Sequence, residues 1–366
     1  MPQKSISRRS LLAAGAAAQA AAATRQPVTG APAAQVVARP QGDPIRIVTM
    51  FEFEPAEISR IESATSAAKV EIIHCKTRPE FRQRLRDAEV VYGGIRGEDL
   101  DFAPKLKWVQ SGGAGVEGME AAVVKSPVVM TNYARTFAPG ISETAIGLLL
   151  ALSRGVVKHY LPQFYRKRTM IPVGSTKSDH HVEMVGRTMG LVGFGGIGSA
   201  IARRAYYGLD MRIVAIDAKP LPKPEYVAEL RDPSWFPEMV PQVDVLVAAA
   251  PHTPQTERMF NENVFRSMKR TAYFLAMSRG MLFDDMALAK ALKEGWIAGA
   301  GLDVFPQEPP PSSHPIFDCD NVIMSAHTSG WSPDRQVRLI DLFADNVRRY
   351  ALGLPLVNVV DKVKGY

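Results

Sequence analysis

The stretch from Met189 to Asp217 constrains the fold more than any other part of the chain. It contains a short apolar run, a glycine-rich turn that reads GFGGIG, a helical pattern, and a second apolar run that ends in an acid. In this order, the parts predict a strand, a tight turn, a helix and a second parallel strand. Such a βαβ unit belongs to a doubly wound sheet, and this glycine spacing is typical of a dinucleotide-binding loop.

Each glycine of the turn has its own expected role. Gly193 permits the tight turn after the strand, Gly195 lets a diphosphate approach the backbone, and Gly198 lets the helix pack close to the strand. Gly196 and Ile197 complete the loop, where free amides and the positive end of the helix would hold the diphosphate. We therefore expect these five residues to bind the cofactor.

The acid that ends the second strand predicts which cofactor is used. Asp217 lies nineteen residues beyond Gly198, where a carboxylate can accept hydrogen bonds from both hydroxyls of the adenosine ribose. A phosphate on the 2′ oxygen would meet a like charge there. The sequence therefore predicts NAD rather than NADP.

The first 25 residues differ in composition from the rest of the chain. They supply +4 of the formal net charge of +7, through Lys4, Arg8, Arg9 and Arg25. The remainder has no basic stripe interleaved with aromatic residues, so nucleic-acid binding is not predicted. Paired arginines before an alanine-rich stretch are typical of a twin-arginine signal, which is read by a machinery that exports folded proteins.

We expect residues 1–25 to be an export signal and residues 26–43, which lack periodicity, to be a linker. The signal would place the protein in the periplasm or outside the cell, and the alternative is a disordered leader on a cytoplasmic enzyme. No stretch after residue 25 has the apolar run of about 20 residues that a membrane-spanning helix needs.

The rest of the chain holds two alternating series of apolar runs and helical patterns. Both predict an α/β fold: two doubly wound parallel-sheet domains, a flavodoxin-like substrate domain and a Rossmann NAD-binding domain, with an active-site cleft between them. We assign residues 44–149 and 331–366 to the substrate domain and residues 150–330 to the NAD-binding domain. A long buried helix is expected from Ile141 to about Arg166, and a closing helix near residues 333–352 should return to the first domain.

Three polar residues each follow an apolar run of the second series. They are Arg279, Glu308 and His327, and they should lie at the carboxyl edge of the sheet, where ligands of open α/β sheets bind. A cation, a carboxylate and an imidazole at this edge are suited to hydride-transfer chemistry. Each also has a plain structural alternative, as a solvated loop residue or a histidine that ends a strand. His180 and His181 have no third ligand spaced near them, so no metal is expected.

The sequence around these three residues resembles the D-isomer-specific 2-hydroxyacid dehydrogenases. The motifs are SRGMLFDDMALAKAL around Arg279, GAGLDVFPQEP around Glu308 and NVIMSAHTSG around His327, all downstream of VGRTMGLVGFGGIG. The resemblance extends from WVQSGGAGVE to NVRRYALGLPLVNVVD, which is nearly all of the chain after the leader. The ordered motifs are specific for the family and only weakly specific for the substrate.

The resemblance implies a role for each residue of the triad. Arg279 would bind the carboxylate and the carbonyl oxygen of a 2-oxo acid through its fork of donors. His327 would be the general acid in reduction and the base in oxidation. Glu308 would orient the imidazole and favour its charged form.

The resemblance also implies contacts around the triad. Backbone amides of Ala114 and Gly115 would complete the carboxylate site, Asp303 would lie near the nicotinamide amide, and Pro251 and Thr256 would line the adenosine side. The chain departs from the family pattern at Met277 and at residues 133–135, in the substrate-facing region. Trp331, four residues after His327, either narrows the pocket or simply packs at the start of the last helix.

From this resemblance we predict an NAD-dependent oxidoreductase that interconverts a small 2-oxo acid, of the glyoxylate, hydroxypyruvate or pyruvate kind, and its D-2-hydroxyacid. A homodimer is expected. One alternative is an enzyme similar to phosphoglycerate dehydrogenase. The other is an NAD-loaded binding or sensor protein without catalysis.

Overall fold

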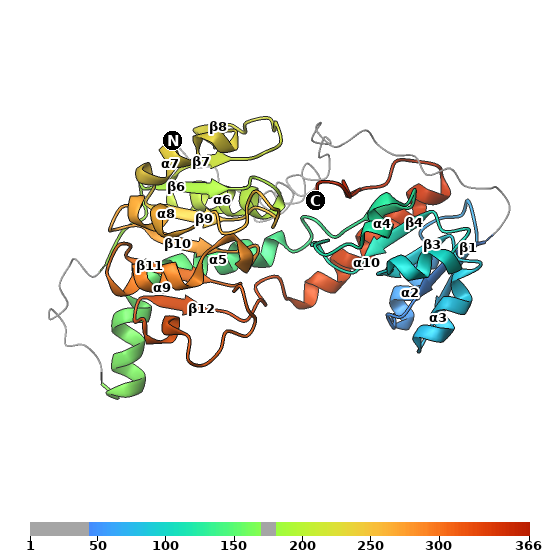
Figure 1. The fold of residues 1–366 in the computed structure, drawn as a ribbon, viewed down its shortest axis with the longest axis horizontal. Coiled ribbons are helices and arrows are strands. Elements are labelled where there is room, and N and C mark those ends of the chain that lie inside the picture. The colour runs from blue at the N-terminus through green and yellow to red at the C-terminus, as the bar shows by residue number, and fades with distance from the viewer. Residues whose placement is uncertain (1–43, 170–180) are drawn as a thin grey trace, which may run out of the picture. The chain divides into compact units, whose positions relative to one another are not determined.

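The computed structural model describes residues 44–169 and 181–366. The predicted export signal (1–25), the predicted linker (26–43) and His180 lie outside the described residues. The described chain contains two sheets, and every strand pair in both is parallel (Figure 1). The predicted α/β fold class is therefore confirmed.

The first sheet has the strand order β2-β1-β3-β4-β5, which is the flavodoxin-like order. Its strands are β1 (Ile45–Thr49), β2 (Val70–His74), β3 (Val90–Gly93), β4 (Trp108–Ser111) and β5 (Val129–Thr131). The short helices that alternate with them are α2 (Pro55–Glu62), α3 (Arg78–Leu85), η2 (Gly97–Phe102) and α4 (Ala121–Lys125). Because helices cover both faces, the strands read as almost continuous apolar runs.

The last helix, α10 (Pro333–Ala351), belongs to the core of this first sheet. Its Phe343, Val347 and Tyr350 are fully buried in one cluster with Ile45 and Ile47 of β1. Figure 1 shows α10, in red, beside the blue and cyan elements of this sheet. Residues from both ends of the described chain therefore build one hydrophobic core.

The second sheet has the order β12-β11-β10-β9-β6-β7-β8. Its strands are β6 (Thr188–Val192), β7 (Arg212–Ile216), β8 (Glu229–Arg231), β9 (Val245–Ala248), β10 (Tyr273–Ala276), β11 (Gly299–Leu302) and β12 (Val322–Met324). The chain runs outward from β6 to β8 and then returns to β9 on the other side of β6. This reversal creates the switch point at which Rossmann folds bind dinucleotides.

Helices cover both faces of the second sheet, and two apolar clusters fill the space between. The helical segments are α5 (Ala138–Ser153), η3 (Val156–Tyr160), η4 (Pro162–Arg166), α6 (Gly196–Leu209), η6 (Pro233–Trp235), α7 (Phe236–Met239), η7 (Val240–Gln242), α8 (Glu262–Ser267), η8 (Gly280–Leu282), α9 (Asp285–Lys293) and η9 (Pro315–Asp318). Gly301 of β11 lets α5 approach closely, because a Cβ there would lie 3.0 Å from the Cβ of Leu148.

The single helix expected from Ile141 to about Arg166 is wrong in its second half. The α-helix α5 ends at Ser153, and Gly155 takes a left-handed φ of 69° before the π-helical segments η3 and η4 begin. The chain bends by 58° at this break. Glycine adopts left-handed backbone without strain, which is why the helix ends there. No single helix in the described ranges is long and apolar enough to cross a membrane, although the bent pair α5 and η3–η4 meets the requirement jointly.

Two further details differ from the sequence expectations. Ala145, Leu148 and Leu149 of α5 already pack in the core of the second sheet, so the predicted domain boundary after residue 149 falls inside a helix. The edge strand β8 was not expected, because its residues Glu229–Arg231 are polar and none of them is buried. An edge strand with one neighbour needs no apolar run to pair.

Candidate active site

The glycine-rich loop has the geometry expected from its spacing. Gly193 has a left-handed φ of 92°, and a Cβ there would lie 2.6 Å from the backbone nitrogen of Ala250. A Cβ on Gly198 would lie only 2.0 Å from the carbonyl oxygen of Gly193, so the helix packs directly on the turn. At Gly195, by contrast, a Cβ would meet no atom within 4 Å. The loop is closed where the protein packs and open where a diphosphate would approach.

The start of α6 and the end of β7 complete this site. Gly195 is the N-cap of α6 and carries no side chain that could satisfy the first amides of the helix. The carboxylate of Asp217 accepts hydrogen bonds from the backbone amides of Phe194 (2.7 Å) and Lys219 (2.8 Å). Each carboxylate oxygen has two acceptor positions, so Asp217 retains capacity for ribose hydroxyls. The residues present therefore fit a nicotinamide dinucleotide.

The remaining predicted cofactor residues lie in or beside this loop and after β9. Ile197 packs at the edge of the core cluster beneath α6. Gly196 lies against Arg135, as described below. Pro251 follows β9, and its carbonyl oxygen accepts a 2.8 Å hydrogen bond from the hydroxyl of Thr256, which fixes that turn. The contacts of Pro251 and Thr256 with the adenosine stay predictions.

The structure brings His327 and Glu308 together. The Nδ1 atom of His327 lies 2.8 Å from Oε2 of Glu308. The other oxygen, Oε1, accepts a 2.8 Å hydrogen bond from the backbone amide of Phe305, so the carboxylate is fixed on both sides. Both side chains are open to solvent, with exposed fractions of 46% for His327 and 40% for Glu308. Because Nδ1 faces Glu308, Nε2 is the atom left to exchange a proton with a ligand.

Buried Asp303 positions the histidine segment. Its Oδ1 accepts hydrogen bonds from the Ser325 hydroxyl (2.8 Å) and the amides of Thr328 (3.1 Å) and Ser329 (3.0 Å). Its Oδ2 accepts one from the Ser329 hydroxyl, and its carbonyl oxygen accepts one from the His327 amide at 2.8 Å. These contacts hold His327 in a left-handed conformation with φ of 54°. The predicted contact of Asp303 with the nicotinamide amide stays a prediction.

Arg279 lies against the loop that carries Ala114 and Gly115. A Cβ on Gly115 would be 2.0 Å from Nη2 of Arg279, so a side chain there would displace the guanidinium from this position. The segment of Arg279 also packs against the loop that carries Glu308. A Cβ on the adjacent Gly280 would lie 1.9 Å from the backbone of Phe305 in that loop. The predicted carboxylate-binding residues, Arg279 and Gly115, are thus neighbours, and the arginine side chain is about one third exposed (29%).

Sequence reasoning missed the partner of Arg279. The guanidinium donates to Glu117 through Nε at 2.8 Å and Nη2 at 3.4 Å, and Nη1 donates to the Ser278 carbonyl at 2.7 Å. Glu117 therefore occupies the face of the arginine that a substrate carboxylate would use. Its position two residues after Gly115, in GGAGVE, was the available signal, because a carboxylate beside an anion site needs a cationic partner.

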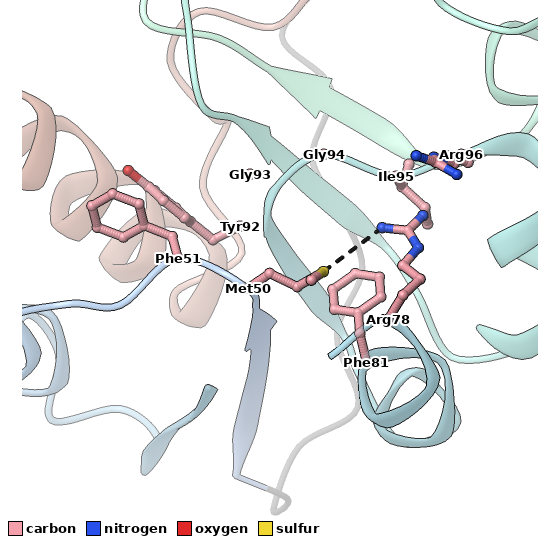
Figure 2. A pocket seen from close by; sticks show the side chains of 9 residues that line it. All are labelled: Met50, Phe51, Arg78, Phe81, Tyr92, Gly93, Gly94, Ile95 and Arg96. Atoms are coloured by element: carbon pink, nitrogen blue, oxygen red, sulfur yellow. Dashed lines mark hydrogen bonds between the residues drawn. The ribbon is translucent and has the colours of Figure 1, made fainter. Parts of the chain in front are cut away.

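A pocket of about 360 Å³ adjoins the first sheet at the carboxyl ends of β1 and β3 (Figure 2). Met50, Phe51 and Phe81 form apolar walls, and Figure 2 shows the Arg78 guanidinium directed toward the Met50 sulfur, 4.0 Å away. Gly93 lies at its edge, and the Gly93 carbonyl accepts a 2.9 Å hydrogen bond from Gly112, so the pocket lies beside the 112–115 loop.

The structure also describes the surroundings of His181 and Trp331, which the sequence analysis singled out. Nε2 of His181 lies 2.7 Å from the Tyr160 hydroxyl, and within the described ranges no three histidine, cysteine or acidic side chains are grouped to hold a metal. Trp331 has an exposed fraction of 67%, and the Arg335 guanidinium lies 4.8 Å from its ring centre. Its role in narrowing a pocket is not tested.

Comparisons with known proteins show which family the chain resembles. Residues 146–329 match the family described as D-isomer specific 2-hydroxyacid dehydrogenase, NAD binding domain. A glyoxylate reductase of Korarchaeum cryptofilum is 33% identical over 289 residues, which cover 76% of this chain and 85% of that protein. A glycerate dehydrogenase of Methylorubrum extorquens is 32% identical over 295 residues, covering 78% and 89%.

A solved structure shares the two-domain fold. It is an NADPH-dependent glyoxylate/hydroxypyruvate reductase of Sinorhizobium meliloti, with a TM-score of 0.71 and 24% identity, covering 89% of this chain and all of that one. The fold and the site define an oxidoreductase that uses a nicotinamide cofactor. The chain belongs to the D-isomer-specific 2-hydroxyacid dehydrogenase family.

Proposed function

We propose that this protein is an NAD-dependent reductase of a small 2-oxo acid of the glyoxylate, hydroxypyruvate or pyruvate kind, forming the D-2-hydroxyacid. The observation that carries the proposal is the 2.8 Å contact between Nδ1 of His327 and Glu308. It leaves Nε2 as a proton donor at the carboxyl edge of a dinucleotide-binding sheet, on a loop fixed by Asp303. A purely structural histidine would not need an oriented carboxylate partner that is itself exposed.

Each residue then has a defined task. The backbone of the 193–198 loop and Asp217 hold the dinucleotide, which supplies the hydride when it is bound. Arg279 and the amides near Gly115 bind the substrate carboxylate and polarise the ketone. His327 delivers the proton to the C2 oxygen during reduction and removes it during oxidation, while Glu308 stabilises the imidazolium.

The pocket beside the 112–115 loop supports a substrate with a short substituent on C2. Glyoxylate carries only a hydrogen as the substituent on C2, and a pocket of about 360 Å³ is larger than this hydrogen requires. Arg78 is paired with Asp99, and Arg96 lies 3.7 Å from Glu98, but each guanidinium has further N–H groups for a hydroxyl group, which favours hydroxypyruvate within the proposed class.

Steady-state turnover with a panel of 2-oxo acids tests this function. Purified protein and NADH are mixed with glyoxylate, hydroxypyruvate, pyruvate and 3-phosphohydroxypyruvate, and loss of NADH absorbance is followed. We expect turnover with at least one of the first three acids. Turnover with the phosphorylated acid alone would instead favour the phosphoglycerate dehydrogenase alternative, and NADH binding without any turnover would favour a sensor protein.

We further propose that the protein is a homodimer. The support for a dimer is the exposed segment η4, which follows α5 and η3. In it, the side chains of Phe164 and Tyr165 are 64% and 70% exposed. Large apolar side chains grouped on a surface mark sites of association. Sedimentation should give a dimer for the wild type, and the double variant Phe164→Ser, Tyr165→Ser should shift toward the monomer. An unchanged dimer in that variant would exclude this surface as the interface.

Finally, we propose that the leader is read by a twin-arginine export machinery. An enzyme organised around a cytoplasmic cofactor is better exported folded than unfolded, because binding the cofactor stabilises the folded state. Cells expressing the full chain should yield a shortened protein in the exported fraction, and the variant Arg8→Lys, Arg9→Lys should remain inside. If both proteins stay cytoplasmic at full length, the leader is only a tail.

A further inference from the structure

Arg135 has an unusual backbone conformation for an arginine. It lies between β5 and α5, and its φ of 72° falls in the left-handed region. Residues other than glycine, asparagine and aspartate rarely adopt this region, because their Cβ comes too close to the neighbouring carbonyl oxygen. A strained conformation of this kind persists only where the surroundings enforce it, and it is concentrated at functional positions.

The glycine-rich loop is shaped to admit this arginine. A Cβ on Gly196 would lie 2.6 Å from Cγ and 2.8 Å from Cα of Arg135. Gly196 has no left-handed φ of its own, so its backbone conformation does not require glycine. Gly196 is the first residue of α6, and its lack of a side chain lets Arg135 approach it closely. The two residues form a matched pair.

The charge of Arg135 has no partner in the described part of the chain. The guanidinium forms no hydrogen bond or ion pair within residues 44–169 and 181–366, and the residue is exposed. Burial lowers the pKa of Lys219, and the Arg135 charge acts on that pKa in the same direction, so the two cations are close in space. Lys219 is itself joined to Asp217 through its backbone amide. An arginine that only faced water would need neither the strained backbone nor the glycine partner.

We propose that Arg135 binds the diphosphate of the nicotinamide dinucleotide, from the side of the glycine-rich loop opposite the amides of α6. The inference rests on the proposed cofactor use and adds a residue outside the dinucleotide-binding motif. A guanidinium fork can donate two hydrogen bonds to adjacent phosphate oxygens, which the backbone amides contact from the other side. Arg135 would then be a cofactor-binding residue, supplied by the segment that connects the two sheets.

The variant Arg135→Gly separates the binding role from any structural one. The affinity for NADH, measured by fluorescence titration, should fall roughly 10-fold or more, because a hydrogen-bonded charge pair is lost. The Tm of the ligand-free protein should stay the same or rise by about 2 °C, because glycine relieves the left-handed strain. Arg135→Asn, which tolerates left-handed backbone, should show the same loss of affinity.

The matched control is Asp210→Gly. Asp210 also has a left-handed conformation, with φ of 50°, but it lies at the opposite end of α6 from the loop. This variant should keep the wild-type affinity for NADH. A loss equal to that of Arg135→Gly would overturn the proposal, because backbone relief alone would then explain the effect.

Nucleotide fragments locate the contact. Arg135→Gly should weaken binding of 5′-ADP and leave the affinity for adenosine unchanged, whereas a selective loss for 2′-AMP would overturn the placement at the diphosphate. If wild-type protein binds NADH and Arg135→Gly binds it equally well, the inference fails and the cofactor assignment stands. If wild-type protein binds neither NADH nor NADPH, the proposed function itself fails.

Discussion

Replacing His327 by alanine is expected to lower the rate of 2-oxo acid reduction by roughly 10²–10⁴-fold while NADH still binds. In the proposed mechanism, the imidazole Nε2, which the contact of Nδ1 with Glu308 leaves free, is the proton donor, and alanine cannot replace it. Because His327 has a left-handed backbone, His327→Asn is the better-matched second variant. Turnover is followed by NADH absorbance, and binding by NADH fluorescence.

The partner carboxylate provides the control. Glu308→Gln keeps the shape of the side chain but removes the negative charge, so kcat should fall less than in the histidine variants. Full activity in His327→Asn would assign proton transfer to another group, and an unchanged kcat in Glu308→Gln would reduce Glu308 to a structural role.

Wild-type protein is expected to prefer NADH over NADPH by roughly 30- to 150-fold in kcat/KM. A 2′-phosphate beside the Asp217 carboxylate would cost about 2–3 kcal/mol, and about 1.4 kcal/mol corresponds to a factor of ten. The carboxylate is held at the end of β7 by two backbone amides, so it cannot easily move away. Initial rates with each cofactor at a fixed 2-oxo acid concentration measure this preference.

The variant Asp217→Ala should narrow the gap, chiefly by improving use of NADPH. Lys219 lies two residues further on, with its ammonium 4.3 Å from the ring centre of Tyr366, and its positive charge stays near this position once the Asp217 carboxylate is gone. Lys219→Met in the Asp217→Ala background should remove that gain. Equal kcat/KM for both cofactors in the wild type would show that Asp217 does not select between them.

Much of the fold could be predicted from the sequence because strands buried on both faces of a parallel sheet consist of nearly continuous apolar residues. The runs at Ile45, Val70 and Val90 each became a strand of the first sheet. The sequence does not predict edge strand β8, because its residues are polar. It also does not predict the end of α5, because the apolar pattern continues past Gly155 although the α-helical backbone ends there. Periodicity reports burial, and it does not report where a glycine turns the chain.

The site was predictable where a residue type carries its own geometry. The glycine spacing specified which positions of the loop had to lack a Cβ, and the distances around Gly193 and Gly198 agree with it. The contacts of Asp303 and Glu117 could not be foreseen, because each depends on a side chain reaching a segment distant in sequence. Arg135 was noticed only as a departure from the family pattern, since its contact with Gly196 spans two separate elements.

The ion pair between Glu117 and Arg279 has a consequence for turnover. The arginine already has a carboxylate on Nε and Nη2, so under the proposed function a substrate acid would exchange with an internal anion rather than enter an empty site. Only the difference between the two contacts contributes to substrate affinity, which keeps the bound acid from becoming too stable. When the hydroxyacid departs, Glu117 can return to the same donors, and the guanidinium is never left without a counterion. Under the proposed function, we therefore expect this internal anion to favour product release at the expense of tight binding.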